Sequence, residues 1–314
     1  MIADTFVVVN PASAGGRTRR QWSDVATRLL SSGVDFETYM TRGPGDATAS
    51  VRNALRSGFG RVVSMGGDGT LNEVINGFFD VDGTPLGSEV PLGVIPSGTG
   101  GDFRKTAGIA KRPLDAVSAI AGGRTRRIDA GRIDYANGSL RHFVNIADCG
   151  LGGEVVARVN RSRFKGGGVR GTAVFLWQSL AVLSTFDAQP VRVHVDDDVV
   201  EERANSVVVA NGQYFGAGMH IAPQASLDDG LFDVVVIAAQ GGLAALRGLP
   251  RVYRGRHLSE PGVTLRRGVR VRVESLGRPL LFDVEGEQVG ATPATVTCLP
   301  GALTLCVAGD RTAR

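Results

Sequence analysis

The sequence predicts an N-terminal α/β domain with a parallel sheet, followed by a C-terminal, mainly antiparallel β-sandwich domain. Three observations lead to this prediction. The 314 residues are enough for two domains of ordinary size. Apolar runs alternate with helical patterns over the first 110 residues. After Arg127, short strand patterns dominate and are separated by glycine and polar turns.

The N-terminal elements follow from the spacing of apolar residues. Strand segments are short, mostly apolar runs, whereas helical segments place apolar residues three and four positions apart. We expect strands over residues 6–9, 36–40, 61–65 and 92–95, and helices over residues 19–31, 47–57 and 71–79. Strands that alternate with helices favour a parallel sheet with covering helices.

The C-terminal elements predict a different architecture. Strand patterns recur there, and two helical patterns interrupt them near residues 172–183 and 243–254. We expect strands over residues 127–134, 141–147, 191–195, 206–211, 231–237, 269–273 and 280–284. Such a series favours an antiparallel sandwich. A boundary near residues 122–127 gives domains of residues 1–127 and 128–303.

The composition excludes several classes of protein. Apolar residues make up 43% and charged residues 21% of the chain, which excludes a disordered, collagen-like or coiled-coil protein. The net charge of +4 is compatible with anionic partners but is modest, and we expect no nucleic-acid partner. Three cysteines without a C-x-x-C pair do not indicate a disulfide framework. Neither a signal-peptide pattern nor an apolar stretch of bilayer length is recognisable, so we expect a cytoplasmic protein.

The sharpest feature is residues 64–73, Ser-Met-Gly-Gly-Asp-Gly-Thr-Leu-Asn-Glu, between a predicted strand and a predicted helix. Its glycines let backbone N–H groups approach a polyanion, and the following helix offers its positive end. Asp68 would repel phosphate unless a cation lies between them, which indicates a nucleotide with bound Mg²⁺. The alternative is a plain strand-to-helix turn that Asp68 caps.

Two further loops follow predicted strands in the same way. Residues 10–16 follow the first strand, and residues 96–103 follow the strand at 92–95. In a parallel sheet these loops meet at the carboxyl edge, where α/β sheets bind ligands. Thr41 falls on the same edge, where its hydroxyl would contact a nucleotide or cap a loop.

Several other motifs are excluded. The sequence has no G-x-x-x-x-G-K-[ST] segment and no lysine before Lys105, so neither a P-loop nor a protein-kinase strand lysine is available. Residues 166–171 match G-x-G-x-x-G, but a basic segment precedes them instead of a strand. The four histidines lack metal-ligand spacing, and no G-x-S-x-G elbow is present.

Together these motifs resemble the diacylglycerol kinase catalytic family, and within it the bacterial soluble lipid kinase branch, which is similar to sphingosine kinases. The resemblance is carried by Gly66-Gly67-Asp68-Gly69-Thr70, the Asn10-Pro11 loop and Gly98-Thr99-Gly100-Gly101-Asp102-Phe103. It continues through residues 145–153, 211–214 and 221–233 to Asp283-Val284-Glu285-Gly286-Glu287. It therefore spans nearly the whole chain.

The resemblance implies an N-terminal nucleotide-binding domain and a C-terminal β-sandwich, with ATP and a lipid hydroxyl meeting in the cleft between them. It also implies that the last strand returns to the first domain, so that residues 304–314 complete it. By motif matching, the ATP contacts fall on Asn10, Pro11, Ala12, Ser13, Ala14, Thr41, Gly66, Gly67, Asp68, Gly69, Thr70, Leu71, Asn72 and Thr99.

The resemblance further implies a Mg²⁺ site in the sandwich domain, on Asp229 with the backbone oxygens of Ser226 and Leu231. The turn at residues 227–230, Leu-Asp-Asp-Gly, is rich in hard oxygen donors, which suits Mg²⁺. An acidic turn without an ion is the alternative.

Two positions depart from the family pattern. Gly101 stands where the family usually has asparagine, and Glu285 stands at the aspartate of its Asp-Gly-Glu motif, whereas Glu287 keeps the glutamate. Phosphoryl transfer needs a base near the acceptor oxygen. Glu287 is the first choice for that catalytic base, with Glu285 and Asp68 as alternatives.

A membrane-derived substrate requires access to an interface. Basic residues flank a glycine-rich segment ahead of apolar residues 173–177 and 180–183; they are Arg161, Arg163, Lys165 and Arg170. We interpret this region as a docking surface for anionic lipid. The basic segment 247–256 would join the same surface. The alternative is a core helix preceded by a solvated loop. Peripheral membrane association is therefore expected.

Two other functions stay open. One is phosphorylation of a soluble acceptor, as in NAD kinases and phosphofructokinases, which share a Gly-Gly-Asp-Gly loop. The other is a lipid-binding protein without turnover, motivated by the departures at Gly101 and Glu285. The identity of the acceptor lipid and a homodimer through a sheet edge are also left open.

Overall fold

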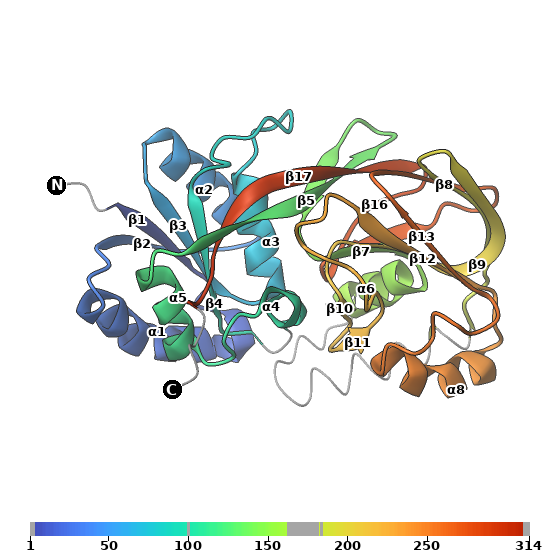
Figure 1. The fold of residues 1–314 in the computed structure, drawn as a ribbon, viewed down its shortest axis with the longest axis horizontal. Helices are drawn as coiled ribbons and strands as arrows, with labels where there is room; N and C mark the ends of the chain where they lie inside the picture. Colours follow the sequence, from blue (N-terminus) through green and yellow to red (C-terminus); the bar gives the residue numbers. More distant parts are fainter. Residues whose placement is uncertain (1–3, 99–100, 162–181, 183–184, 310–314) are drawn as a thin grey trace. The chain divides into compact units, whose positions relative to one another are not determined.

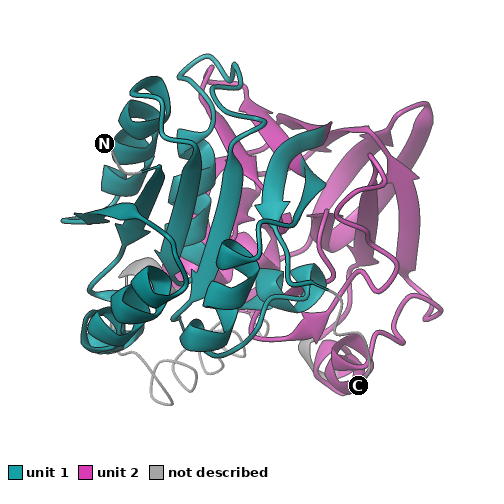
Figure 2. Cartoon of the chain, turned by 60° about the vertical axis from the view of Figure 1, so that its left-hand side comes forward, with its two compact units in different colours: residues 1–129, 301–314 teal, residues 130–300 magenta. Residues whose placement is uncertain are grey.

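A computed structural model describes residues 4–98, 101–161, 182 and 185–309 of the chain. The chain forms two compact units (Figure 2). Unit 1 contains Met1–Asp129 and Gly301–Arg314, and unit 2 contains Ala130–Pro300. Two strands, β5 (Thr125–Tyr135) and β17 (Ala294–Cys306), contribute residues to both units. Among the described residues, no helix is long and apolar enough to cross a bilayer.

Unit 1 contains a parallel sheet with the strand order β2-β1-β3-β4-β17 (Figure 1). Its elements are β1 (Thr5–Val9), α1 (Ser13–Ser31), β2 (Phe36–Met40), α2 (Asp46–Arg56), β3 (Arg61–Gly66), α3 (Asp68–Gly77), β4 (Pro91–Pro96), α4 (Asp102–Ala107) and α5 (Pro113–Ala121). The predicted α/β domain with a parallel sheet is confirmed. Helix α1 begins earlier than the periodicity predicts, and α4 and α5 are additional, because short helices of one or two turns carry little periodic signal.

The core of unit 1 explains its apolar strands. Alternate residues of β1 and β3, such as Val7 and Val63, are fully buried against α1 and α5. Their neighbours Val8 and Val62 are also fully buried, and α2 and α3 contact β1 and β3. In a parallel sheet that is covered on both faces, neither side of a strand meets water. The sequence of each strand is therefore a continuous apolar run.

Unit 2 is built from antiparallel strands, with the order β16-β15-β7-β9-β8-β14-β17. Strand β12 pairs with β9 and β13, and β5 pairs with β6. The elements are β6 (Leu140–Phe143), β7 (Ile146–Gly150), α6 (Leu151–Arg161), β8 (Gln189–Val195), β9 (Asp198–Ala210), β10 (Tyr214–Phe215), β11 (Met219–His220), β12 (Phe232–Ala238), α8 (Gly242–Tyr253), β13 (Val263–Gly268), β14 (Arg270–Ser275), β15 (Leu281–Val284) and β16 (Glu287–Ala291). The predicted antiparallel architecture is confirmed.

The sandwich core consists of alternating side chains from these strands. Phe143 stacks on Phe232 with ring centroids 5.7 Å apart, and Tyr135 meets the edge of the Phe282 ring. The predicted helix over residues 243–254 corresponds to α8. Except for Val182, the helix predicted over residues 172–183 lies outside the described residues.

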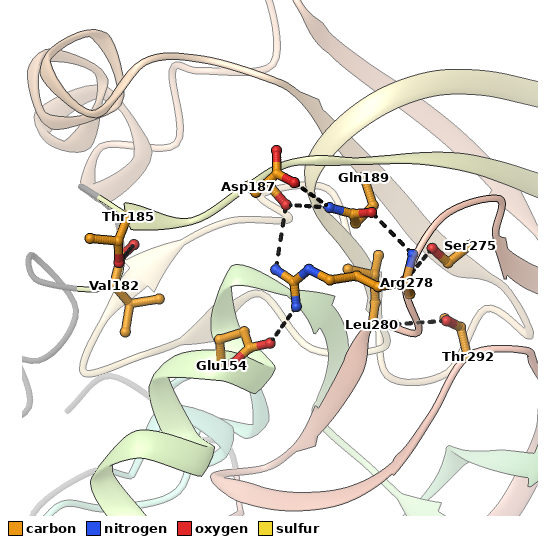
Figure 3. A network of polar contacts seen from close by, with 9 residues as sticks. All are labelled: Glu154, Val182, Thr185, Asp187, Gln189, Ser275, Arg278, Leu280 and Thr292. Carbon is orange, nitrogen blue, oxygen red and sulfur yellow. Dashed lines mark hydrogen bonds and ion pairs between the residues drawn. The ribbon is translucent and has the colours of Figure 1, made fainter.

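Helix α6 is fixed to the sandwich by Arg278, as Figure 3 shows. The guanidinium of Arg278 pairs with Glu154 of α6 at 2.8 Å and lies over the ring of Phe186, 5.4 Å from its centroid. Its backbone N–H donates to Oε1 of Gln189, whose amide donates in turn to Asp187. These contacts hold the start of α6 directly after β7.

Candidate active site

The glycine-rich loop after β3 is shaped by close backbone approaches. A Cβ atom on Gly66 would lie 2.5 Å from Oγ1 of Thr70, and one on Gly98 would lie 2.6 Å from Cα of Gly67. Glycine is therefore required at both positions, because no side-chain atom fits in that space. The loops after β3 and β4 touch each other at this point.

The loop after β1 joins the same edge through Asn10. Its amide Nδ2 donates to Oγ1 of Thr70 at 2.9 Å, while its Oδ1 accepts the N–H of Ala12 at 3.1 Å. Beyond β2, the N–H of Thr41 donates to the carbonyl of Val9. The structure thus places Asn10, Thr41 and the loop at residues 66–72 at one edge of the sheet.

Helix α1 starts with a kink that shapes this loop. Ala14, Gly15 and Gly16 all have positive φ angles, of 54°, 65° and 83°. Beyond the kink, the hydroxyls of Thr18 and Ser97 lie 2.7 Å apart and both are buried. This contact ties the first turns of α1 to the loop after β4.

A cavity of about 470 Å³ lies beside these loops in unit 1. Its lining includes Gly66, Gly67, Ser97 and Gly98. Four of the described lining residues are cationic: Arg17, Arg104, Lys111 and Arg112. None of the four was predicted as a site residue from the sequence, although Arg17 and Arg104 each lie directly beside a glycine-rich loop. A polyanion is the ligand that this lining fits.

Asp68 connects the two glycine loops. Its Oδ2 accepts the N–H of Gly101 at 2.8 Å, and the carboxylate also accepts the N–H of Asp102. Burial raises the pKa of Asp68, and these backbone hydrogen bonds partly offset that effect. Helix α3 begins with Gly67 in an extended conformation and has no side-chain cap in the described structure. The first N–H groups of a helix have no acceptor within the helix, so the start of α3 suits an anion.

In unit 2, Glu287 and Glu285 have different partners. Glu287 forms an ion pair with Arg141, with 2.7 Å between Oε2 and Nη2. Glu285, at a positive φ of 55°, accepts the N–H groups of Val144 (2.8 Å) and Asn145 (2.7 Å). These two bonds also explain why the strand predicted over residues 141–147 is divided into β6 and β7. The carboxylate of Glu285 therefore binds backbone N–H groups, whereas the carboxylate of Glu287 binds the side chain of Arg141.

A pair of carboxyl groups lies on the neighbouring strands β7 and β15, where the buried Asp148 and the half-buried Asp283 pair in register. Asp283 Oδ1 accepts the N–H of Gly286 at 2.7 Å, within the turn that precedes Glu287. Burial raises the pKa of Asp283 to about 7, and burial together with the charge of Asp283 raises the pKa of Asp148 well above its ordinary value. Sequence reasoning missed this pair because cross-strand register is not visible in a local pattern.

In the turn predicted to hold Mg²⁺, the carboxylates form hydrogen bonds and an ion pair with other groups of the protein. Asp229 Oδ1 accepts the N–H of Leu231 at 3.1 Å, and its Oδ2 pairs with the guanidinium of Arg267. The hydroxyl of Ser226 donates to Asp228. The described residues contain no group of three or more histidine, cysteine or acidic side chains arranged to hold a metal ion. In this arrangement Asp229 does not fit a metal ion. Its Oδ1 accepts a backbone N–H, and its Oδ2 is paired with the cationic side chain of Arg267.

Some predicted residues lie outside the described part of the chain. They are Thr99 among the nucleotide contacts and Arg163, Lys165 and Arg170 of the basic segment, together with the side chain of Arg161. The second basic segment is described: Arg247, Arg251, Arg254 and Arg256 are exposed on α8 and after its end.

Two family profiles match the chain, the Diacylglycerol kinase catalytic domain over residues 4–133 and the YegS C-terminal NAD kinase beta sandwich-like domain over residues 145–307. A diacylglycerol kinase of Mycobacterium tuberculosis strain H37Rv is 29% identical over 306 residues, covering 96% of this chain and 94% of that protein. One from Staphylococcus haemolyticus is 28% identical over 307 residues, covering 97% of this chain and 88% of that protein. A solved structure of a diacylglycerol kinase from Bacillus anthracis has the same fold, with a TM-score of 0.72, 22% identity and 98% of each chain covered.

The α/β unit with its glycine loops and the sandwich unit define an enzyme of the lipid kinase class. The chain belongs to the diacylglycerol kinase catalytic family.

Proposed function

We propose that this enzyme transfers the terminal phosphate of MgATP to a hydroxyl of diacylglycerol or a related lipid. The observation that carries the proposal is the cationic cavity beside the glycine loops of unit 1. A triphosphate matches its charge, and the N–H groups at the start of α3 add hydrogen-bond donors. In this proposal residues 1–127 and 304–314 bind nucleotide, and residues 128–303 bind the lipid.

In this proposal the residues that line the cavity have different roles in phosphate binding. Arg17, Arg104, Lys111 and Arg112 neutralise phosphate charge in place of a P-loop lysine. Asp68 keeps the two glycine loops together and is the cavity carboxylate that would face a nucleotide-bound Mg²⁺, which supplies further charge neutralisation when bound. A carboxylate has about four acceptor positions, so the two backbone hydrogen bonds of Asp68 leave room for such an ion.

Glu287 is the residue proposed to accept the proton of the lipid hydroxyl. Its carboxylate lies on β16 and pairs with the side chain of Arg141, which fixes its orientation. Glu285 is less suited to this role because its Oε1 already accepts two backbone N–H groups. Asp68 is less suited because its carboxylate accepts two backbone N–H groups and joins two loops.

Peripheral membrane binding is a further part of the proposal. Helix α8 exposes Leu246 and Tyr253, each 44% accessible and seven positions apart, and therefore on one face. Arg247 and Arg251 are exposed on the same helix. Apolar side chains combined with arginines are typical of helices that lie on an anionic lipid surface.

The test is incubation of the enzyme with radiolabelled ATP, Mg²⁺, NAD and a total bacterial lipid extract. Labelled products in the lipid fraction and in the aqueous fraction are then identified by mass. We expect a labelled lipid that carries one additional phosphate, and the Glu287→Gln variant serves as the low-activity control. Label incorporated only into a soluble acceptor such as NAD would favour the soluble-acceptor alternative. No labelled product in either fraction would favour a binding protein without turnover.

A further inference from the structure

The side chain of Arg267 connects Asp229, in the turn that precedes β12, with Asp233 in β12. Its Nε donates to Oδ1 of Asp233 at 2.8 Å, and its Nη2 pairs with Oδ2 of Asp229. Asp233 and Arg267 are direct register partners on the antiparallel strands β12 and β13. The position of the guanidinium is therefore set by the sheet.

A nearby positive charge is needed to balance the carboxylates of Asp229 and Asp233. The side chain of Asp233 is completely buried, and one of its oxygens, Oδ2, has no hydrogen-bond partner in the described structure. A buried carboxylate without a counter-charge is strongly unfavourable, because burial removes its hydration. Asp229 brings a second negative charge, and its Oδ1 is already occupied by the N–H of Leu231. A guanidinium supplies one positive charge and five N–H donors in a fixed planar geometry, so it can bind two carboxylates at once.

We propose that Arg267 is a built-in counter-ion that occupies the position of the divalent ion implied by family resemblance at the Ser226–Leu231 turn. In this chain the turn is consequently held by a side chain and does not depend on Mg²⁺. Removal of the guanidinium would leave the carboxylates of Asp229 and Asp233 together with backbone oxygens, which is the ligand chemistry that Mg²⁺ and Mn²⁺ prefer. The variant Arg267→Gln should therefore gain the ion dependence that the natural chain lacks.

The experiment uses the whole 314-residue chain without ATP or lipid, so its outcome is independent of the kinase proposal. Thermal unfolding is measured after EDTA treatment, with and without millimolar MgCl₂ or MnCl₂, and bound Mn²⁺ is counted by electron paramagnetic resonance. For the natural chain we expect no ion-dependent shift. For Arg267→Gln we expect a melting temperature lower by roughly 5 °C or more, recovered in a saturable way by either ion.

Two further variants assign the effect. Arg266→Gln removes the adjacent arginine, which lies 3.6 Å from Asp198, and should show no ion response. Asp229→Asn added to Arg267→Gln should abolish the recovery by Mn²⁺. The proposal is overturned if the natural chain binds one Mn²⁺ that Asp229→Asn removes, or if folded Arg267→Gln gains no ion response. If Arg267→Gln does not fold, the Mn²⁺ count on the natural chain and on Asp229→Asn still decides the matter.

Discussion

The carboxylate of Asp68 accepts the backbone N–H of Gly101 at 2.8 Å, and Gly101 has a left-handed φ angle of 78°. Glycine and asparagine adopt this conformation more readily than other residues. The departure from the family's asparagine at this position therefore preserves the backbone that presents the N–H to Asp68. The contact couples the loop after β3 to the loop after β4, the two loops that border the cationic cavity.

The close approach of the two loops predicts unequal effects of two alanine substitutions. In Gly98→Ala the new Cβ would lie 2.6 Å from the backbone of Gly67, so the loops must move apart at a cost of about 1–3 kcal/mol. In Gly67→Ala the nearest atom is 3.5 Å away, an ordinary contact. We expect Gly98→Ala to weaken ATP binding at least tenfold by calorimetry and Gly67→Ala to bind much more like the natural protein. Equal ATP affinity for the two variants would contradict this prediction.

The cationic lining predicts a specific loss of nucleotide affinity. Replacement of Lys111 or Arg112 by glutamine should raise KM for ATP about tenfold, because a charge-assisted hydrogen bond contributes roughly 1.5–3 kcal/mol. The value of kcat should change less. Arg20→Gln is the control, since Arg20 is exposed on α1 and is not among the lining residues. A KM for ATP that is equally insensitive to all three substitutions would remove these cations from the nucleotide site.

The different partners of Glu287 and Glu285 predict different defects. Glu287→Gln removes proton acceptance and should lower kcat by about 10²–10⁴ with little change in KM for ATP. Glu285→Gln weakens two hydrogen bonds to the backbone and should mainly lower stability, by about 1–3 kcal/mol. Steady-state kinetics and thermal unfolding of both variants separate the effects. A larger loss of kcat in Glu285→Gln would transfer the base role to Glu285.

The carboxyl pair of Asp148 and Asp283 predicts a pH-dependent stability. Burial, the main cause, and the charges of Glu285 and Glu287 raise the pKa of Asp283 from 3.8 to about 7, so the folded chain keeps a proton that the unfolded chain releases. This contribution is fully present below about pH 4 and is lost as the pH rises through about 7. For this group the unfolding free energy should fall by up to about 1.4 kcal/mol per pH unit in that window.

The test of this pH effect is urea unfolding of the natural chain and Asp283→Asn between pH 4 and pH 8, followed by circular dichroism. The asparagine stays neutral, so the variant should show a flatter profile. Asp197→Asn, in an exposed turn of the same unit, should leave the profile unchanged. Parallel profiles for Asp283→Asn and the natural chain would mean that the pair does not titrate in this range.

The sequence by itself determined the two kinds of architecture and the position of the glycine loops. Strand and helix periodicities are local properties, so residues 61–65 and 36–40 could be assigned to strands from their own composition and neighbours. The order strand, glycine loop, helix then placed Asn10, Thr41 and Asp68 at one edge of a parallel sheet, because all parallel strands end on the same side.

Only the tertiary structure decided the partners of the charged residues. Arg141 and Glu287 are 146 positions apart, and Arg267 and Asp229 are 38 positions apart, yet each pair is in contact. Arg17 and Lys111 likewise line one cavity, although Arg17 lies on α1 and Lys111 lies between α4 and α5. Such pairings depend on sheet register and on the path of the chain between strands, and neither leaves a periodic signal in the residues themselves. An acidic turn that looks like a metal site in the sequence therefore has an arginine as its neighbour in the fold.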